Sequence, residues 1–541
     1  MRRTPYGTYA RLTTFLIGVA MLLGAALFYV ACLVAIHFTI AVNSVLTIGP
    51  ATGKRTNPPA DGLLAGFAAA LLWTLSAVVL LVLLAGSASV WPIGLIVGLP
   101  LGLVVGWQVG SWRGSLSWSR YPSSLRLGWW RSRPFFVSRP YTVTALERTK
   151  HLACSGATGS GKSTLIRNLI LQDLLSGAGL CVIDPKDDLI DGILPHVPSN
   201  RLNDVVLFDA TDTEMPLGLN PFAGVPKSQR SLAASEIISV FRRYFSDAWG
   251  ARLEHVLRNV VLALLEVPGA TLLDVPRMLL DRSFSQWALA HVENSSVREF
   301  FSVEYEEILR RRSDAIEPIL NKVGPWLSYP ELRNIIGQPT SSFDIRHVMD
   351  RGQVLFVRIP QGTLGEDGSN LLGALIVAKV QLAAQSRVDA PGHLRRPFHL
   401  YVDEFQNFAT SSFTKILTEA RAFGLGLVCV NQYPEQLSRD LQLALARNAA
   451  TFAYCNYQRG QYTVEVMRQE DAREKKPRVF VVRPPAPLRR GDEARAAELR
   501  ELSRQRYGRP TGEALAKGAG SEGIGNERVL VATASRDMEE E

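Results

Sequence analysis

A glycine-rich segment at residues 156–164 carries the clearest chemical signal in this sequence. It reads Gly-Ala-Thr-Gly-Ser-Gly-Lys-Ser-Thr and matches the phosphate-binding loop pattern G-x-x-x-x-G-K-[ST] without a mismatch. Glycines let such a loop turn tightly and point successive backbone N–H groups at a polyanion. Residues 151–155 are strand-like and residues 165–175 have helical spacing, so the phosphates would lie at a helix N-terminus. The segment therefore predicts a nucleoside triphosphate site.

The residues of this loop have distinct expected roles. Lys162 would bring positive charge to the outer phosphates, and Ser163 would offer its hydroxyl to Mg²⁺. The expected cofactors are thus ATP and Mg²⁺. A Gly/Ser turn that matches by chance is the alternative, and the flanking strand and helix argue against it. The predicted nucleotide-binding set is Gly156, Ala157, Thr158, Gly159, Ser160, Gly161, Lys162, Ser163 and Thr164.

Two carboxylates far along the chain, Asp403 and Glu404, follow a mostly apolar run that begins at Phe398. This is the Walker B pattern, in which Asp403 would hold Mg²⁺ with its water shell and Glu404 would orient and deprotonate the attacking water. Gln432 ends another buried strand-like run and is placed to sense the γ-phosphate. The alternatives are plain surface charge for the carboxylates and a turn-capping amide for Gln432.

The segments between these motifs predict the elements that must position them. Apolar runs at residues 179–184, 204–209 and 352–359 are typical of buried parallel strands, and a helix is expected at 371–384. The first run ends in Asp184-Pro-Lys186. Because strand ends present chemistry in α/β sheets, these two charged residues would approach nucleotide or DNA, unless they only form a local ion pair in a loop.

Helical periodicity replaces the strand pattern in the middle of the chain, which predicts an all-α insertion. Three consecutive arginines at residues 310–312 spread around a helix; they are either a solvated face or a contact for DNA or a partner protein. The predicted domains are a membrane region at residues 1–110, a basic and aromatic linker at 111–144, an α/β P-loop ATPase core at 145–225 and 346–465, the all-α insertion at 226–345, and a partly disordered tail at 466–541.

An apolar stretch at residues 12–42 carries no charge apart from His37 and is longer than the ~20 residues needed to span hydrocarbon. A signal peptide would have an apolar core of only about 7 to 15 residues. A second uncharged run at residues 62–107 is long enough for two spans. Arginines flank both ends of the region, so we expect two or three transmembrane helices, with the ATP site on the cytoplasmic side of the inner membrane. The linker either contacts anionic lipid headgroups or is a plain connection.

Composition narrows the remaining choices. The chain has 541 residues, 47% of them hydrophobic, and a formal net charge of +9, which permits a DNA partner without proving one. No cysteine has C-x-x-C spacing and no histidine falls into a ligand pattern, so structural zinc is not expected. We interpret the five cysteines as reduced core residues. This chain is not expected to be an ATP-binding cassette protein. The signature of that class should lie just before Walker B, whereas the only similar string here, at residues 175–179, lies just after the P-loop.

Taken together, these motifs resemble the HerA and FtsK superfamily of ring ATPases, and within it the membrane-anchored coupling proteins of conjugative type IV secretion, of the TraD and TraG kind. The resemblance covers roughly residues 145–465. One departure is the segment at residues 446–450, where the family more often has a glycine-containing turn. The residues that carry the resemblance are Gly156–Thr164, Ile183–Lys186, Leu219–Phe222, Gly362–Glu366, Leu371–Gly373, Val402–Asn407, Glu419–Arg421, Asn431 and Gln432.

The resemblance implies a RecA-like core that assembles as a homohexamer, hydrolyses ATP between subunits and draws single- or double-stranded DNA toward a secretion channel. A relaxase, the channel proteins and inner membrane lipids would be its partners. Such rings need an arginine from the neighbouring subunit, for which Arg333 and Arg421 are the candidates. The alternatives are an ATPase that powers protein export or assembly in a type IV machine without binding DNA, and an ATP-dependent membrane scaffold.

Overall fold

The computed structural model describes residues 125–132, 137–244, 249–310, 316–458, 461–468, 478–488 and 490–511. The predicted transmembrane region therefore lies outside the described residues, as do Cys32 and two of the three consecutive arginines, Arg311 and Arg312. All described residues belong to one compact unit that begins at Tyr121.

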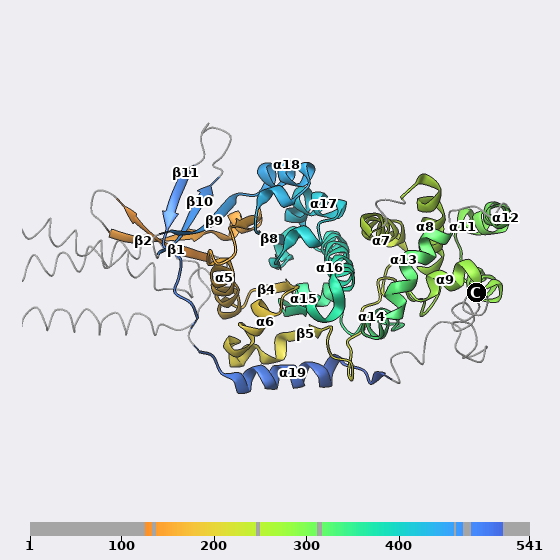
Figure 1. Ribbon diagram of the computed structural model, residues 1–541, viewed down its shortest axis with the longest axis horizontal. Coiled ribbons are helices and arrows are strands. Elements are labelled where there is room, and N and C mark those ends of the chain that lie inside the picture. The colour runs from red at the N-terminus through yellow and green to blue at the C-terminus, as the bar shows by residue number, and fades with distance from the viewer. Residues whose placement is uncertain are drawn as a thin grey trace, which may run out of the picture. The chain divides into compact units, whose positions relative to one another are not determined.

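A nine-stranded, largely parallel sheet forms the centre of this unit (Figure 1). Its strands lie in the order β11-β10-β9-β3-β8-β7-β4-β6-β5. Strands β9 to β5 in this order run parallel, whereas β10 and β11 are antiparallel additions at one edge. The strands are β3 (Leu152–Ser155), β4 (Gly179–Asp184), β5 (Val205–Asp209), β6 (Val354–Arg358), β7 (Phe398–Val402), β8 (Leu425–Asn431), β9 (Thr451–Gln458), β10 (Gln461–Arg468) and β11 (Arg478–Val482).

Helices cover both faces of the sheet, because the central strands are apolar on both sides. In β4, for example, Cys181 and Ile183 join one buried hydrophobic cluster while Leu180 and Val182 join another. This arrangement confirms the predicted α/β fold with a parallel sheet. The helices next to the sheet are α4 (Ala145–Arg148), α5 (Lys162–Ser176), α6 (Asp188–Asp191), α15 (Ile345–Arg351), α16 (Gln361–Ser386), α17 (Ser411–Glu419), α18 (Arg439–Asn448) and α19 (Glu493–Tyr507).

The described residues between β5 and β6 form helices and turns, with no strand among them. Helix α7 packs against both α8 and α16, so the helices share one continuous hydrophobic cluster with one face of the sheet. Phe241 of α7 and Leu375 of α16 both belong to this cluster. These helices are α7 (Arg230–Tyr244), α8 (Ala251–Leu264), α9 (Asp274–Leu280), α10 (Arg282–Leu289), α11 (Ser295–Glu299), α12 (Tyr305–Arg310), α13 (Glu317–Ser328) and α14 (Pro330–Ile336).

Helix α16 is the only helix of the described ranges that is long and apolar enough to cross a membrane, over residues 361–389. It is mostly buried inside the protein. Its apolar character follows from packing between the sheet and the α7 helix layer, since buried core helices are apolar on most of their surface.

The sheet continues beyond residue 465, so the predicted end of the core is placed too early. Strand β10 pairs with β11, where Val466 lies opposite Phe480. The predicted linker also holds regular structure: β1 (Leu125–Ser132) and β2 (Val137–Val143) form an antiparallel hairpin. Trp129 of this hairpin exchanges backbone hydrogen bonds with Arg483, at 2.9 and 2.8 Å.

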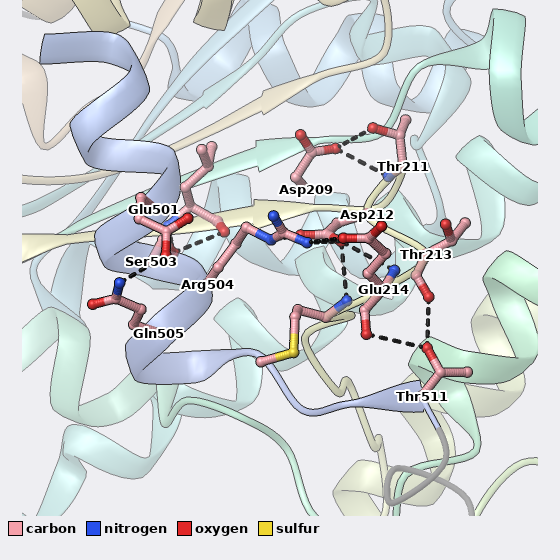
Figure 2. A network of polar contacts seen from close by, with 12 residues as sticks. Asp209, Thr211, Asp212, Thr213, Glu214, Glu501, Ser503, Arg504, Gln505 and Thr511 are labelled. Carbon is pink, nitrogen blue, oxygen red and sulfur yellow. Dashed lines mark hydrogen bonds and ion pairs between the residues drawn. The ribbon is translucent and has the colours of Figure 1, made fainter. Parts of the chain in front are cut away.

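Helix α19 lies within the tail at residues 466–541, which the sequence predicts to be partly disordered. The Ser503 hydroxyl accepts a hydrogen bond from the Leu207 amide at 2.9 Å and donates to the Leu207 carbonyl at 3.0 Å. Figure 2 shows Arg504 reaching from α19 to Asp212 and Glu214, each with a closest approach of 2.7 Å. Ala496 and Leu499 of α19 are buried in the same hydrophobic cluster as the apolar residues of α5. A polar helix thus completes the core beside β5, the opposite edge from β11.

A buried ion pair connects α4 to α5. The guanidinium of Arg148 is 2.5 Å from the Asp173 carboxylate, which also accepts a hydrogen bond from the Tyr401 hydroxyl at 2.6 Å. All three side chains are buried. Burial and the Asp173 charge both raise the pKa of Tyr401. The network joins α4, α5 and β7, and thereby connects the helix after the P-loop to the strand that precedes Asp403.

We expect Asp173→Asn to destabilise the protein by about 3–5 kcal/mol, because it leaves the buried Arg148 cation without its charged partner. A lower thermal unfolding midpoint, measured by circular dichroism on the full chain, checks this expectation. Glu293→Gln is the matched control, since Glu293 and Lys227 form an exposed ion pair, a kind that adds little to stability. Equal midpoints for the two variants would contradict the expectation.

His151, directly before β3, is held as a neutral side chain. Its Nε2 lies 3.2 Å from the Leu417 carbonyl, while its Nδ1 accepts a hydrogen bond from the Leu427 amide at 3.0 Å, so the ring donates through Nε2. Burial lowers the pKa of His151 to about 4, although the hydrogen bond to the Leu417 carbonyl favours the charged form.

The stability of the fold should therefore depend on pH through His151. Its pKa is about 4 in the folded chain and 6.5 ordinarily, so its contribution is complete above pH 6.5 and is lost as the pH falls toward 4. The slope is about 1.4 kcal/mol per pH unit for one group. Unfolding midpoints between these pH values should vary less for His151→Gln than for the control His347→Gln, an exposed histidine. Parallel curves would refute the assignment.

Candidate functional site

The phosphate-binding loop connects β3 to α5 through a tight turn of the backbone. Gly159 and Gly161 have φ angles of 77° and 91°, in the left-handed region that glycine favours. At Gly156 a side chain would not fit, since a Cβ atom would lie 2.4 Å from the Cys455 carbonyl oxygen and 2.7 Å from the Ser160 hydroxyl. The loop therefore takes its shape from the three glycines that the sequence motif contains.

Several features of this loop fit a bound triphosphate. Gly161 caps α5 without any side-chain hydrogen bond, so the first N–H groups of the helix face the loop. The Ser160 hydroxyl is buried without a hydrogen-bond partner among the described residues. The Lys162 ammonium folds over the loop and donates to the carbonyls of Gly156 and, at 3.1 Å, Ala157. Donors and positive charge thus gather where an anion would bind.

The carboxylate pair lies where β7 ends, as the sequence predicts for a Walker B strand. Strand β7 stops at Val402, and Glu404 follows with φ of 46°, an uncommon angle for a residue with a side chain. One oxygen of the Glu404 carboxylate forms an ion pair with Lys186, and the other accepts a hydrogen bond from the Gln406 amide at 2.5 Å. The sequence analysis left a local ion pair of Lys186 open but did not name Glu404 as its partner.

Three neighbouring carboxylates have shifted pKa values. Burial, with repulsion from Asp184 and Glu404, raises the pKa of Asp403 to about 7. Burial also raises the pKa of Asp184 to about 6, against hydrogen bonds from the Ile190 and Lys186 amides. For Glu404, burial is outweighed by hydrogen bonds from Lys186 and Gln406 and by the Lys186 charge, so its pKa is lowered. Crowded negative charge of this kind favours a cation between the carboxylates.

Gln432 connects the phosphate-binding loop to the carboxylate pair. Its backbone carbonyl accepts a hydrogen bond from the Gly156 amide at 3.2 Å. Its side-chain amide lies near Glu404 and helps to lower the pKa of that carboxyl. Strand β8, which ends just before Gln432, lies between β3 and β7. The loop and Glu404 therefore both lie next to Gln432, at the carboxyl ends of the central strands, although they are far apart in the sequence.

The described residues contain no group of three or more His, Cys, Asp or Glu side chains able to hold a metal ion on their own. Mg²⁺ commonly binds through one or two carboxylates together with waters and substrate phosphates. The residues here fit that donor set, with the Asp403 carboxylate near the end of β7 and the Ser163 hydroxyl in the first turn of α5.

The loop after β4 contacts elements on both sides of the site, and the sequence analysis missed most of these contacts. Arg167 of α5 donates to the Asp188 carbonyl at 2.5 Å. Arg358, at the end of β6, lies 3.0 Å from Asp187 and 2.9 Å from Asp209. Asp184 itself turns back on this loop. Only the position of these charges at strand ends signalled such a network.

The helical layer also reaches the Walker B segment. Arg243 of α7 donates to the carbonyls of Ala409 and, at 2.7 Å, Gln406. Lys415 of α17 lies 3.2 Å from Glu236 of α7. An arginine near the end of an insertion helix gives no signal of such a role in the sequence.

Asn220 explains part of the Leu-Asn-Pro-Phe motif. Its side-chain amide donates to the carbonyls of Ala270 at 2.8 Å and Pro339 at 2.9 Å. Its backbone carbonyl accepts from Lys379 of α16 at 2.8 Å. Burial lowers the pKa of Lys379 to about 8. Asn220 thus fastens the segment after β5 to both the helical layer and α16.

The two arginines proposed for contact with a neighbouring subunit are exposed and lie on different elements. Arg421 is in the turn Ala420–Phe423, directly before β8. At about 3.3 Å per strand residue, that turn is about 20 Å from Gln432 at the other end of β8. Arg421 is therefore too far from the nucleotide site of its own chain to act there. Arg333 lies on α14, which packs against α16. Both assignments stay predictions.

We expect Gly156→Ala to weaken nucleotide binding at least tenfold, because the added methyl group collides with the Cys455 carbonyl and the loop must shift. Titration of the full chain with a fluorescent ATP analogue checks this. Gly392→Ala is the control, since a Cβ atom there meets nothing within 4 Å. Equal affinities for the two variants would show that the loop does not bind nucleotide in this conformation.

The chain matches a known protein family and one curated protein. A family model described as the type IV secretion-system coupling protein DNA-binding domain matches residues 140–453. Among curated proteins, the DNA double-strand break repair helicase HerA of Sulfolobus acidocaldarius is 23% identical over 305 residues, 54% of this chain. These residues span 53% of HerA, about half its length.

Two solved structures are also similar to the chain. The plasmid coupling protein TrwB in complex with the non-hydrolysable GTP analogue GDPNP is 18% identical, with coverage of 64% of this chain and 88% of TrwB and a TM-score of 0.46. VirB4 of Thermoanaerobacter pseudethanolicus is 13% identical, with coverage of 67% of this chain and 96% of VirB4 and a TM-score of 0.45.

Proposed function

Because this chain belongs to the family of type IV secretion-system coupling proteins, by the model of their DNA-binding domain, we propose that it is a membrane-anchored DNA translocase. In this proposal ATP hydrolysis drives DNA toward a secretion channel. The observation that supports it most is the position of Gln432, whose carbonyl accepts a hydrogen bond from the Gly156 amide of the phosphate-binding loop and whose side chain lies near Glu404. A triphosphate bound to the loop would then have a carboxylate base beside it.

The proposed chemistry divides among a few side chains. The loop amides and Lys162 bind the triphosphate. Glu404 accepts a proton from the attacking water, and Gln432 hydrogen-bonds near the γ-phosphate. Mg²⁺, held by Ser163 and Asp403, would offset the charge on the phosphate oxygens. The water oxygen bonds to the γ-phosphorus as the bond from that phosphorus to the ADP oxygen breaks.

The remaining parts of the proposal concern assembly and location. The chain works as a homohexamer in which Arg333 or Arg421 of one subunit reaches the nucleotide of the next. Residues 1–110 anchor it in the inner membrane through two or three helices, with lipid headgroups near the linker and the ATPase in the cytoplasm. A relaxase and the channel proteins are its protein partners, and single- or double-stranded DNA its substrate. What supports this part is the family membership and the apolar sequence before residue 110.

We expect DNA to stimulate ATP hydrolysis by the purified full chain, and Lys162→Ala to lower the rate at least about 100-fold with or without DNA. Stimulation should weaken steeply between about 50 and 200 mM salt, because phosphate contacts release counterions. Lys227→Ala, in an exposed ion pair, is the control and should behave as the unaltered chain.

The outcomes separate the competing functions. A rate that DNA leaves unchanged but Lys162→Ala abolishes would favour an ATPase for protein export or assembly. If the chain hydrolyses no ATP under any condition, an ATP-driven motor is excluded and the membrane scaffold is favoured.

A further inference from the structure

Both oxygens of the Glu404 carboxylate are held by side chains, one from its own segment and one from a segment far away in the sequence. Lys186, from the loop after β4, forms an ion pair with Oε1, and Gln406 donates to Oε2 at 2.5 Å. The Glu404 side chain is only 7% exposed, whereas Lys186 is 46% exposed. The carboxylate is thus fixed in direction by a cation that stands between it and solvent.

The charges around Glu404 make this cation important. Asp184 ends β4 and Asp403 follows the neighbouring strand β7, and the charges of Asp184 and Glu404 both act on Asp403. Lys186 is attracted to Glu404, Asp403 and Asp188. Without Lys186, the Glu404 carboxylate would face Asp403 with only amide donors to hold it. Repulsion would then favour rotation of the side chain away from Asp403.

The backbone at Glu404 adds to this need. Its φ of 46° is in the left-handed region, which is strained for a residue with a side chain and persists only where surrounding contacts impose it. The Asn407 amide donates to the Glu404 carbonyl at 2.8 Å, and the Asp403 amide donates to the Ile183 carbonyl at 3.1 Å. These bonds fix the backbone, so the side-chain partners decide where the carboxylate points.

We propose that Lys186 is a positioning residue for ATP hydrolysis, which holds the Glu404 carboxylate in the direction from which it activates the attacking water. The inference rests on the proposed function, since it takes Glu404 as the base. Lys186 acts through Glu404 and moves no proton itself. Its loop is held in turn by Arg358 through Asp187 and by Arg167 through the Asp188 carbonyl.

Steady-state ATPase kinetics of the full chain test this role. Lys186→Met keeps the length of the side chain but removes its charge, and we expect kcat to fall about 10- to 100-fold, part of what a general base contributes. KM and the affinity for a fluorescent ATP analogue should stay within about twofold, because the loop amides and Lys162 are untouched. Lys186→Arg keeps the charge and should restore kcat to within about fivefold, which a change in folding alone would not predict.

A double substitution tests whether Lys186 works through Glu404. In the Glu404→Gln background, Lys186→Met should lower kcat by less than about twofold, because residues that act as a unit are non-additive. Lys227→Met is the matched control: it removes a lysine from an exposed ion pair with Glu293 and should leave kcat unchanged. Thermal unfolding midpoints of all variants show whether each one folds.

Other results would overturn the inference. If Lys186→Met leaves kcat unchanged or raises it, Lys186 does not position the base; a raised kcat would make it an inhibitory contact. Additive losses in the double variant would mean that Lys186 acts independently of Glu404. If Lys162→Ala and Glu404→Gln also leave hydrolysis intact, the proposed function fails together with the inference. If those two abolish hydrolysis and Lys186→Met does not, only the inference fails.

Discussion

The pairing of β3 with β8 and of β8 with β7 is the constraint on which the candidate site depends. Parallel pairing brings the carboxyl ends of all three strands to the same edge of the sheet. The hydrogen bond from the Gly156 amide to the Gln432 carbonyl extends this pairing by one residue beyond the strands. A shift of β8 along its neighbours would move Gln432 away from both the loop and Glu404. The seven buried residues of β8 resist such a shift, since each would leave its apolar surroundings.

Much of this arrangement could be predicted from the sequence because its signals are local. The glycines and Lys162 define the phosphate-binding loop, and continuous apolar runs indicate the parallel strands. The additions at the sheet edge were missed, because β10 and β11 alternate between buried and exposed residues and carry no motif. Helix α19 was missed as part of the core because it is strongly polar and buries only a few side chains.

The ion pair between Lys186 and Glu404 could not be predicted as a pair, since 218 positions separate the two residues in the sequence. The same holds for Arg243, whose contacts with the Gln406 and Ala409 carbonyls depend on how α7 packs. Gln406 in turn binds Glu404, so the helical layer and the carboxylate are linked by one intervening residue. Because α7 and α16 also share a hydrophobic cluster, a displacement of the helical layer would shift the residues that follow β7.

The course of the chain after β11 has a consequence for biosynthesis. From the sheet edge formed by β11, the chain passes α5, where Asn168 donates to the Ala486 carbonyl at 3.1 Å, and then places α19 beside β5 at the other edge. Buried leucines beneath α19, such as Leu194 and Leu207, can be covered only after this helix leaves the ribosome. The nascent chain would therefore expose an incomplete apolar face to chaperones after the sheet has been synthesised and until α19 has emerged.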